Sequence, residues 1–448
     1  AQNTATGVHA LRDNVDGTYN TADGFAALLE VTSGSYNTAL GGNAARNITT
    51  TDNTTAIGYD ALRNDTQSGN TAVGKNAGKA NTTGENQVAI GFDALAANTY
   101  GSHNVVIGHE AAKVANPMYN TVAIGRKSLT AVTSANNNTA VGSESMKSNT
   151  TGETNVAMGY AALQQNTTAD ENTAVGTSAM QFNTEGEKHV AVGRQALQSN
   201  TTQDGKTAIG YQAAKASTTG SGVTAVGYQA LHACTTGNSN TAVGNSALLN
   251  ITTGYSNVAV GNNAGSASGN TGGLFNTYIG NGAGGNNTSS GNTMIGNIAG
   301  NTSTTGNQVM CLGHQAQPSS ATVSGEITLG SSSISGLRCN VQTISSLSDG
   351  RDKTNVIDLP EGLDFITKLR PVKFEWATRD GNGKDGSYEH GFIAQDLQAA
   401  QKEYDADYLK MVMDENPDRL EASYGKLVPI LVKAIQELSV KVKALEAG

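Results

Sequence analysis

The 448-residue sequence is poor in cysteine, proline, tryptophan and charged residues, and it lacks long apolar runs. It contains three cysteines, six prolines and one tryptophan, and only 15% of its residues are charged. Cys234, Cys311 and Cys339 are odd in number and lack metal-ligand spacing, which favours packing residues over a disulfide framework or a metal centre. A net charge of -9 without a basic stripe argues against nucleic acid as a partner. No apolar run is long enough to cross a bilayer, so we expect no membrane insertion.

Catalytic and metal-binding motifs are also scarce before residue 348. The histidines there are scattered, and no two stand at metal-ligand spacing. No pair of carboxylates stands in a setting typical of a glycosidase. We therefore expect no cofactor and no metal. The chain begins at Ala1 without a charged or apolar leader, as expected of a mature product or a fragment.

What the sequence has instead is a repeat. The glycine of units such as Asn-Thr-Ala-Val-Gly, which we call the marker glycine, recurs from Gly7 to Gly313, and fifteen of the eighteen intervals are seventeen residues long. Seventeen residues cannot bury a core alone, so the repeat predicts a solenoid of stacked coils. The short β-branched run before each glycine predicts one strand per coil, and Asn-Thr-Thr-Gly predicts a second corner. Recurring Gly, Asn and Thr disfavour helix.

The repeat also predicts which positions face the interior. The residue before the marker glycine is Val, Ile, Leu or Met in seventeen of nineteen units, and residues such as Val175 and Val226 are expected inside. The alanines two before and three after the glycine suit a narrow core. Gln195 and Gln229, two residues after the glycine, are expected to point outwards. Nineteen coils at about 4.8 Å each would form a rod of roughly 90 Å.

A threonine ladder at the second corner leaves two interpretations open. Regular threonine arrays on a flat solenoid face can bind ice, but stacked, hydrogen-bonded polar corners are the favoured interpretation. The ladder consists of Thr150, Thr167, Thr184, Thr201, Thr218, Thr235 and Thr252.

Composition changes at residue 348, which divides the chain into a shaft (1–317), a connector (318–347) and a C-terminal domain (348–448). The last 101 residues carry 33 charged residues, against 32 in the 347 before them. In the connector, residues 326–329 and 337–344 are predicted to form short strands. The C-terminal domain alternates helical and strand-like signals, and its first helix is expected to stop before Pro371.

The boundary itself holds a candidate catalytic pair. Ser348 and Lys353 flank Asp349-Gly350, a strong turn signal that could fold Lys353 back towards Ser348. A serine hydroxyl becomes a nucleophile when a base removes its proton, and a desolvated lysine amine can be that base. Burial or a nearby cation such as Arg351 would lower the pKa of the amine as this role requires. Taken alone, Ser-Asp before a polar run is more typical of a loop or a helix cap.

Four motifs carry a resemblance to a known family. They are SDGRDKTN (348–355), LRPVKFEW (369–376), HGFIAQ (390–395) and AIQEL (434–438). In this order they resemble the intramolecular chaperone, a self-cleaving serine peptidase domain at the C-terminus of phage tail spikes and tail fibres, the endosialidase spikes among them. The resemblance implies cleavage of the Leu347–Ser348 bond by Ser348, with Lys353 as base. His390 matches a family position linked to processing, and a purely structural role for it is equally open.

The shaft unit resembles the left-handed parallel β-roll in the heads of trimeric autotransporter adhesins. That family's unit is three residues shorter, which leaves the cross-section open. Both resemblances imply a homotrimer, in which the connector is expected to form a β-prism. The last segment is predicted to be a short coiled coil, although β-branched a and leucine d positions nominally favour two strands. The a positions are Val428, Ile435 and Val442, and the d positions are Leu431, Leu438 and Leu445.

These features together predict the distal part of a homotrimeric tail fibre or tail-fibre-like adhesin, located on a virion tail. The shaft would attach to a host cell-surface receptor, a glycan or a surface protein. The C-terminal domain would direct trimer assembly and cleave itself off. A bacterial cell-surface fibre with the same chaperone, and an ice-binding solenoid, are the alternatives.

Overall fold

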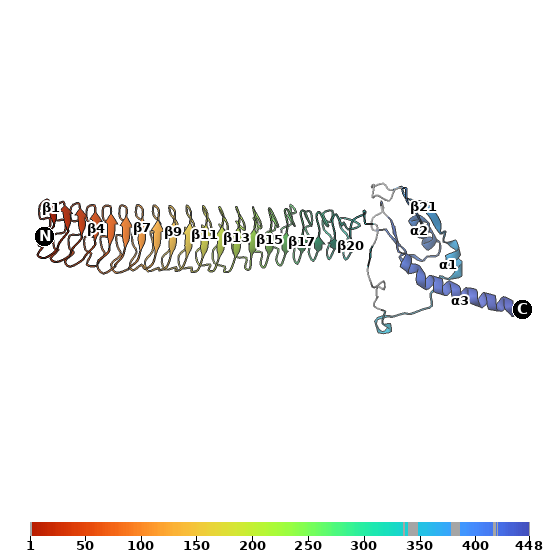
Figure 1. Ribbon diagram of the computed structural model, residues 1–448. Coiled ribbons are helices and arrows are strands. Elements are labelled where there is room, and N and C mark those ends of the chain that lie inside the picture. Colours follow the sequence, from red (N-terminus) through yellow and green to blue (C-terminus); the bar gives the residue numbers. More distant parts are fainter. Residues whose placement is uncertain are drawn as a thin grey trace.

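A computed structural model describes residues 2–334, 337–338, 348–377, 386–414, 418 and 420–447. It consists of a long solenoid followed by a small α+β domain that ends in helix α3 (Figure 1). In the solenoid, twenty three-residue strands form one parallel sheet from β1 (Thr4–Thr6) to β20 (Ile327–Leu329). The prediction of a mainly β solenoid with one strand per seventeen-residue unit is confirmed.

The strands repeat with the marker glycine. Between β1 and β20 they are β2 (Thr21–Asp23), β3 (Thr38–Leu40), β4 (Thr55–Ile57), β5 (Thr71–Val73), β6 (Val88–Ile90), β7 (Val105–Ile107), β8 (Val122–Ile124), β9 (Thr139–Val141), β10 (Val156–Met158), β11 (Thr173–Val175), β12 (Val190–Val192), β13 (Thr207–Ile209), β14 (Thr224–Val226), β15 (Thr241–Val243), β16 (Val258–Val260), β17 (Thr277–Ile279), β18 (Thr293–Ile295) and β19 (Met310–Leu312).

The marker glycine is required by the stacking of the coils. All nineteen have φ between +122° and +142°, where a side chain is strained. At Gly176, a Cβ atom would also lie 2.6 Å from the carbonyl oxygen of Gly193 in the next coil. No residue with a Cβ fits this approach, so the glycine column follows from the geometry of one coil resting on the next.

The alanine in the middle of each typical strand, and not the residue before the marker glycine, faces the interior of the solenoid. Ala174 and Ala225, the middle residues of β11 and β14, are fully buried, as the alanine slots predict. Val175 and Val226 beside them are only half-buried. The prediction that the residue before the marker glycine faces the interior is wrong: side chains alternate along a strand, so the alanine points inwards and the valine outwards. The larger core residues come from the corner instead, as with Leu231, which is fully buried at φ +52°.

Two columns of buried amides run along the inside of the second corner. In one column, the backbone N–H of Asn172 donates to Oδ1 of Asn155 at 3.0 Å, and its Nδ2 donates to the carbonyl oxygen of Gly186 at 2.9 Å. In the facing column, Nδ2 of Asn166 donates to Oδ1 of Asn149 at 2.9 Å. These ladders satisfy backbone groups at the corner that no strand partner reaches.

His189 interrupts the first amide column, and we expect it to make the shaft sensitive to acid. Its Nδ1 accepts a hydrogen bond from the N–H of Lys206 at 3.0 Å, and burial lowers the pKa of the ring to about 4. The unfolded chain has a histidine pKa near 6.5. The stability that depends on the neutral ring is therefore present above pH 6.5 and is lost as pH falls towards 4.

The substitution His189→Asn restores the usual amide and should remove this loss. Between pH 7 and pH 4.5 the variant is expected to lose about 2 to 3 kcal/mol less unfolding free energy per chain than the wild type. Denaturant unfolding followed by circular dichroism at the two pH values measures the difference. An identical loss in both proteins would contradict the assignment.

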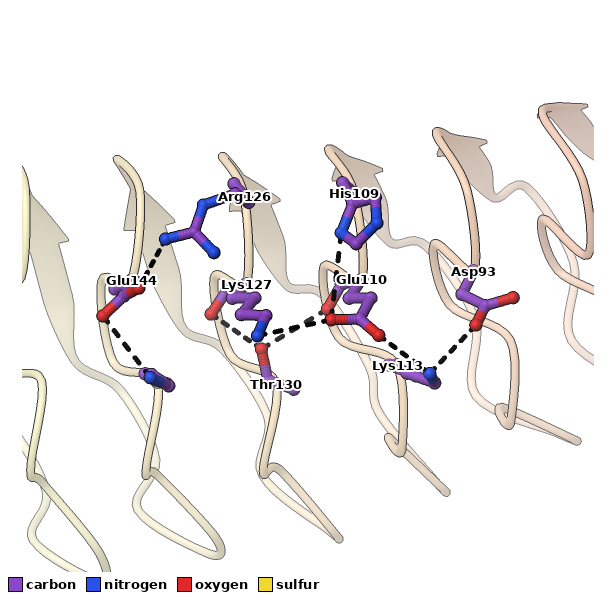
Figure 2. A network of polar contacts seen from close by, with 9 residues as sticks. Asp93, His109, Glu110, Lys113, Arg126, Lys127, Thr130 and Glu144 are labelled. Carbon is purple, nitrogen blue, oxygen red and sulfur yellow. Dashed lines mark hydrogen bonds and ion pairs between the residues drawn. The ribbon is translucent and has the colours of Figure 1, made fainter.

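Charged side chains line one edge of the solenoid and connect successive coils (Figure 2). Nζ of Lys113 lies 2.9 Å from Oδ2 of Asp93 and 3.0 Å from Oε1 of Glu110, and this lysine lowers the pKa of Glu110. Further along, the guanidinium of Arg126 lies 2.6 Å from Oε1 of Glu144 in the next coil. Exposed pairs of this kind are screened by solvent and contribute little to stability individually.

The solenoid sheet extends into the connector. Strand β20 pairs in parallel with β19, with Met310 opposite Ile327, so the sheet runs beyond residue 317 to Leu329. The second predicted connector strand, 337–344, lies mostly outside the described residues. The β-prism stays a prediction.

The C-terminal domain packs around Phe365, Leu397, Met411 and Ile430. The predicted helix before Pro371 is present, and a strand follows the proline. Phe374 and Trp376 are half-buried and contact each other edge to face. The elements are η1 (Gly350–Asp352), α1 (Leu363–Lys368), β21 (Val372–Glu375), β22 (Tyr388–Gly391), α2 (Ala394–Glu403), η2 (Asp407–Leu409), β23 (Val412–Met413), β24 (Glu421–Ala422), η3 (Tyr424–Lys426) and α3 (Leu427–Glu446).

Candidate functional site

The residues at the start of the C-terminal domain form a tight turn. Asp349 caps the short helix η1, because its Oδ1 accepts a hydrogen bond from the N–H of Arg351 at 2.9 Å. The N–H of Lys353 then donates to the carbonyl oxygen of Gly350 at 3.3 Å and closes the turn. The chain therefore reverses direction between Ser348 and Lys353.

The turn brings Ser348 and Lys353 into contact. Nζ of Lys353 lies 2.6 Å from Oγ of Ser348 and 3.4 Å from the carbonyl oxygen of the same residue. A nucleophile within hydrogen-bond reach of a base is the geometry that covalent catalysis requires. In an extended chain these two side chains, five residues apart, would point to opposite faces.

The electrostatic surroundings of the pair differ from one sequence-based expectation. Arg351 could serve as the cation that lowers the pKa of Lys353. Its guanidinium instead lies 2.5 Å from Oδ2 of Asp349, and this contact lowers the pKa of the Asp349 carboxyl. The positive charge of Arg351 is thus largely offset by its own neighbour.

Ser348 and Lys353 are both exposed in the single chain. A lysine amine acts as a general base when it is desolvated, because burial disfavours its charged form. The geometry of the pair is present, whereas the desolvation that would activate Lys353 is not supplied by residues of the same chain that the structure describes. Leu347, the residue before Ser348, lies outside the described residues.

His390 lies on a different element from the pair. It is exposed on β22, opposite Lys373 of β21, in an antiparallel two-stranded sheet. The hydrogen bonds of Ser348 and Lys353 among the described residues do not include His390.

Helix α3 presents two distinct faces. Leu427, Ile430 and Ala434 are buried against the rest of the domain. The predicted heptad residues form a second stripe, and each is between 43% and 83% exposed. This apolar stripe is made of Val428, Leu431, Ile435, Leu438, Val442 and Leu445.

One contact that ties α3 to the domain was missed at the sequence level. Oε2 of Glu437 accepts a hydrogen bond from the N–H of Leu363 at 2.8 Å, at the first residue of α1. Gly362 allows this approach, because a Cβ there would lie 2.4 Å from the carboxylate. The motif AIQEL contains Glu437, but a helix-capping contact across 74 residues has no local sequence signal.

Metal and membrane sites are not apparent in the described part of the chain. Among those residues no group of His, Cys, Asp or Glu could hold a metal ion. Of the helices described, none has the length and apolar character needed to span a bilayer. Cys234 and Cys311 are buried free thiols, as expected of packing residues, and Cys339 lies outside the described residues.

Comparison with known proteins identifies one domain. Residues 348–405 match a peptidase family described as the chaperone of endosialidase. The match begins at Ser348 and includes the turn with Lys353, α1, the β21–β22 hairpin and α2. It does not extend over the shaft. The chain has no match among curated proteins.

Proposed function

We propose that this chain, a β-solenoid shaft whose residues 348–405 match the endosialidase-chaperone family, is a tail-fibre-like protein that forms a homotrimer and frees its shaft by cutting the Leu347–Ser348 bond. The family indicates an assembly and autoproteolytic role for the domain. The observation that supports the specific bond and residues is the 2.6 Å contact between Lys353 Nζ and Ser348 Oγ, at the residue where the family match begins.

The proposed reaction uses the residues of the turn alone. Lys353 takes the proton from Oγ of Ser348, and Oγ attacks the carbonyl carbon of Leu347. The peptide bond to the nitrogen of Ser348 breaks, an ester to Oγ forms, and the proton passes to the departing amine. Water then hydrolyses the ester, leaving a carboxylate on Leu347 and a free amino group on Ser348.

The exposure of the pair supports a link between cleavage and assembly. Lys353 becomes an effective base when its amine is desolvated, since burial disfavours the charged form. In a single chain the amine faces solvent. A neighbouring copy that covers the turn would provide the missing burial, so cleavage would follow assembly.

Two apolar surfaces support association of several copies. The first is the exposed heptad stripe of α3, whose spacing is that of a coiled coil. The second is the outer face of the shaft sheet, where the outward residue before each marker glycine is apolar in nearly every coil. Val190, Ile209 and Val260 on this face are 38%, 40% and 38% exposed. Exposed apolar residues that gather on one face often mark an interaction surface.

The role proposed for the shaft is attachment to a host cell surface, through a glycan or a surface protein. Twenty coils at about 4.8 Å give a reach of nearly 100 Å, and the rod carries no catalytic motif of its own. A position on a virion tail, or alternatively on a bacterial surface, fits such a rod. The ice-binding alternative is weaker, because the ladder hydroxyls are used internally: Oγ1 of Thr150 donates to the carbonyl of Thr167 at 2.9 Å, and Thr167 donates likewise to Thr184 at 3.0 Å.

The substitution Leu438→Asp tests the assembly part of the proposal. It places three carboxylates in the centre of the proposed coil, which costs several kcal/mol. We expect most of the trimer to be lost in light scattering, and the cleaved fraction on a denaturing gel to fall with it. Gln436→Asp, an exposed change on the same helix outside the stripe, should behave as the wild type. Normal assembly and cleavage of Leu438→Asp would contradict the proposal.

A further inference from the structure

In one coil, a lysine amine takes the place of one of the two side-chain amides that face each other in the inner columns. Lys206 stands in the first column one coil after His189, and Asn200 stands opposite it in the second. The equivalent pair in an earlier coil consists of two amides, with Nε2 of Gln87 donating to Oδ1 of Asn81 at 2.9 Å. At the later position, Nζ of Lys206 lies 2.5 Å from Oδ1 of Asn200.

The surroundings of Lys206 are unusual for a cation. Both Lys206 and Asn200 are 0% exposed, and a buried ammonium is costly unless a carboxylate compensates its charge. The other partners of Nζ are neutral, namely Oγ of Ser217 at 3.0 Å and the carbonyl oxygen of Thr218 at 3.2 Å. Among the ion pairs of the described residues, none includes Lys206. Burial lowers the pKa of the amine to about 8, so its neutral, nucleophilic form is accessible near neutral pH.

The carboxamide of Asn200 is held in a fixed position. Its Nδ2 donates to Oδ1 of Asn183 at 2.7 Å, and Asn183 is held in the same way by Asn166 at 3.1 Å. An amine and a carboxamide that are both immobilised in contact have already lost the freedom that slows the same reaction in solution.

We propose that Lys206 and Asn200 form an intramolecular isopeptide bond in the folded shaft. Nζ of Lys206 adds to Cγ of Asn200, the Cγ–Nδ2 bond breaks, and ammonia leaves. The proton that Nζ loses ends on the departing nitrogen. Oγ of Ser217 lies 3.0 Å from Nζ, and Nε2 of His189 lies 3.0 Å from the departing Nδ2. The reaction needs no oxidant and no second substrate. Its product is a neutral amide, which removes the buried charge and joins the two columns covalently.

The bond is tested by the mass of the wild-type shaft and by its tryptic peptides. Folded wild-type protein is kept at pH 9, where the amine is mostly neutral, and then denatured and digested. We expect the majority of chains to be lighter than their sequence by one ammonia. Trypsin should no longer cut after Lys206, so that residues 195–215 appear as one peptide that has lost ammonia.

Two variants separate the bond from other modifications. Lys206→Asn, which restores an amide at this position, should keep its full sequence mass. Lys188→Met, which removes an exposed lysine of the preceding coil, should still lose ammonia. Hydrolysis of the Asn200 amide would raise the mass slightly and leave the cut after Lys206 intact. Folded wild type at full sequence mass, cut normally after Lys206, would overturn the proposal, and this result would leave the proposed cleavage at Ser348 unaffected.

Discussion

Ala225→Asp is expected to prevent the shaft from folding around its coil. Ala225 is fully buried and stacks in register between Ala208 and Ala242, whose methyl groups offer no hydrogen bond to a carboxylate. An unpaired buried carboxylate costs several kcal/mol per chain, and the larger side chain must also displace its neighbours. Loss of the β signal in circular dichroism and rapid proteolysis within the shaft would report the effect.

The control places the same charge at the surface of the same coil. Gln229 is half-buried at the edge of the solenoid, where its Nε2 donates to Oε1 of Gln212 at 2.9 Å. Gln229→Asp loses this partly buried contact, and its unfolding free energy should lie within about 1 kcal/mol of that of the wild type. An equal loss of stability from both substitutions would mean that Ala225 does not face the interior while Gln229 faces the surface.

Ser348→Ala is expected to abolish cleavage while leaving assembly intact. The substitution removes the proposed nucleophile from an exposed turn that makes few contacts, so no folding defect is expected. Lys353→Arg should have the same effect, because it keeps the charge but its guanidinium cannot act as a base. Both variants should run as one uncut chain on a denaturing gel and as the wild-type oligomer in light scattering.

Asp352→Asn is the matched control for these variants. Asp352 is exposed in the same turn, and its side chain takes no part in the Ser348–Lys353 contact. It should therefore be processed normally. Cleavage of Ser348→Ala at the wild-type rate would show that Ser348 is not the nucleophile.

Periodicity alone predicts most of the shaft, and it misleads at one point. The seventeen-residue repeat predicts one strand and two corners per coil, because a single unit cannot bury a core and must stack on its neighbours. The inward residue cannot be chosen by hydrophobicity, however. Val175 is more apolar than Ala174, yet the alanine occupies the buried middle position of the strand and the valine beside it is half-buried. The valine then faces outwards, where the sequence of one chain gives no sign of what covers it.

The candidate site, too, could be predicted from the sequence only in part. The contact between Ser348 and Lys353 follows from a local turn signal, since Asp349 and Gly350 favour the reversal that joins them. The environment that would activate Lys353 depends on surfaces outside the turn, and no local pattern encodes it. The contact between Lys206 and Asn200 could not be predicted from the sequence either, because it depends on two corner columns that face each other across the coil.

Assembled wild-type protein is expected to cut itself between Leu347 and Ser348, and the masses of its products measure this cleavage. The freshly expressed chain is first shown to be folded and oligomeric, and is then denatured and weighed by mass spectrometry. We expect one fragment of residues 1–347 and one of residues 348–448 that begins with a free amino group on Ser348. A single uncut chain, recovered from a preparation whose shaft is folded and assembled, would contradict this expectation.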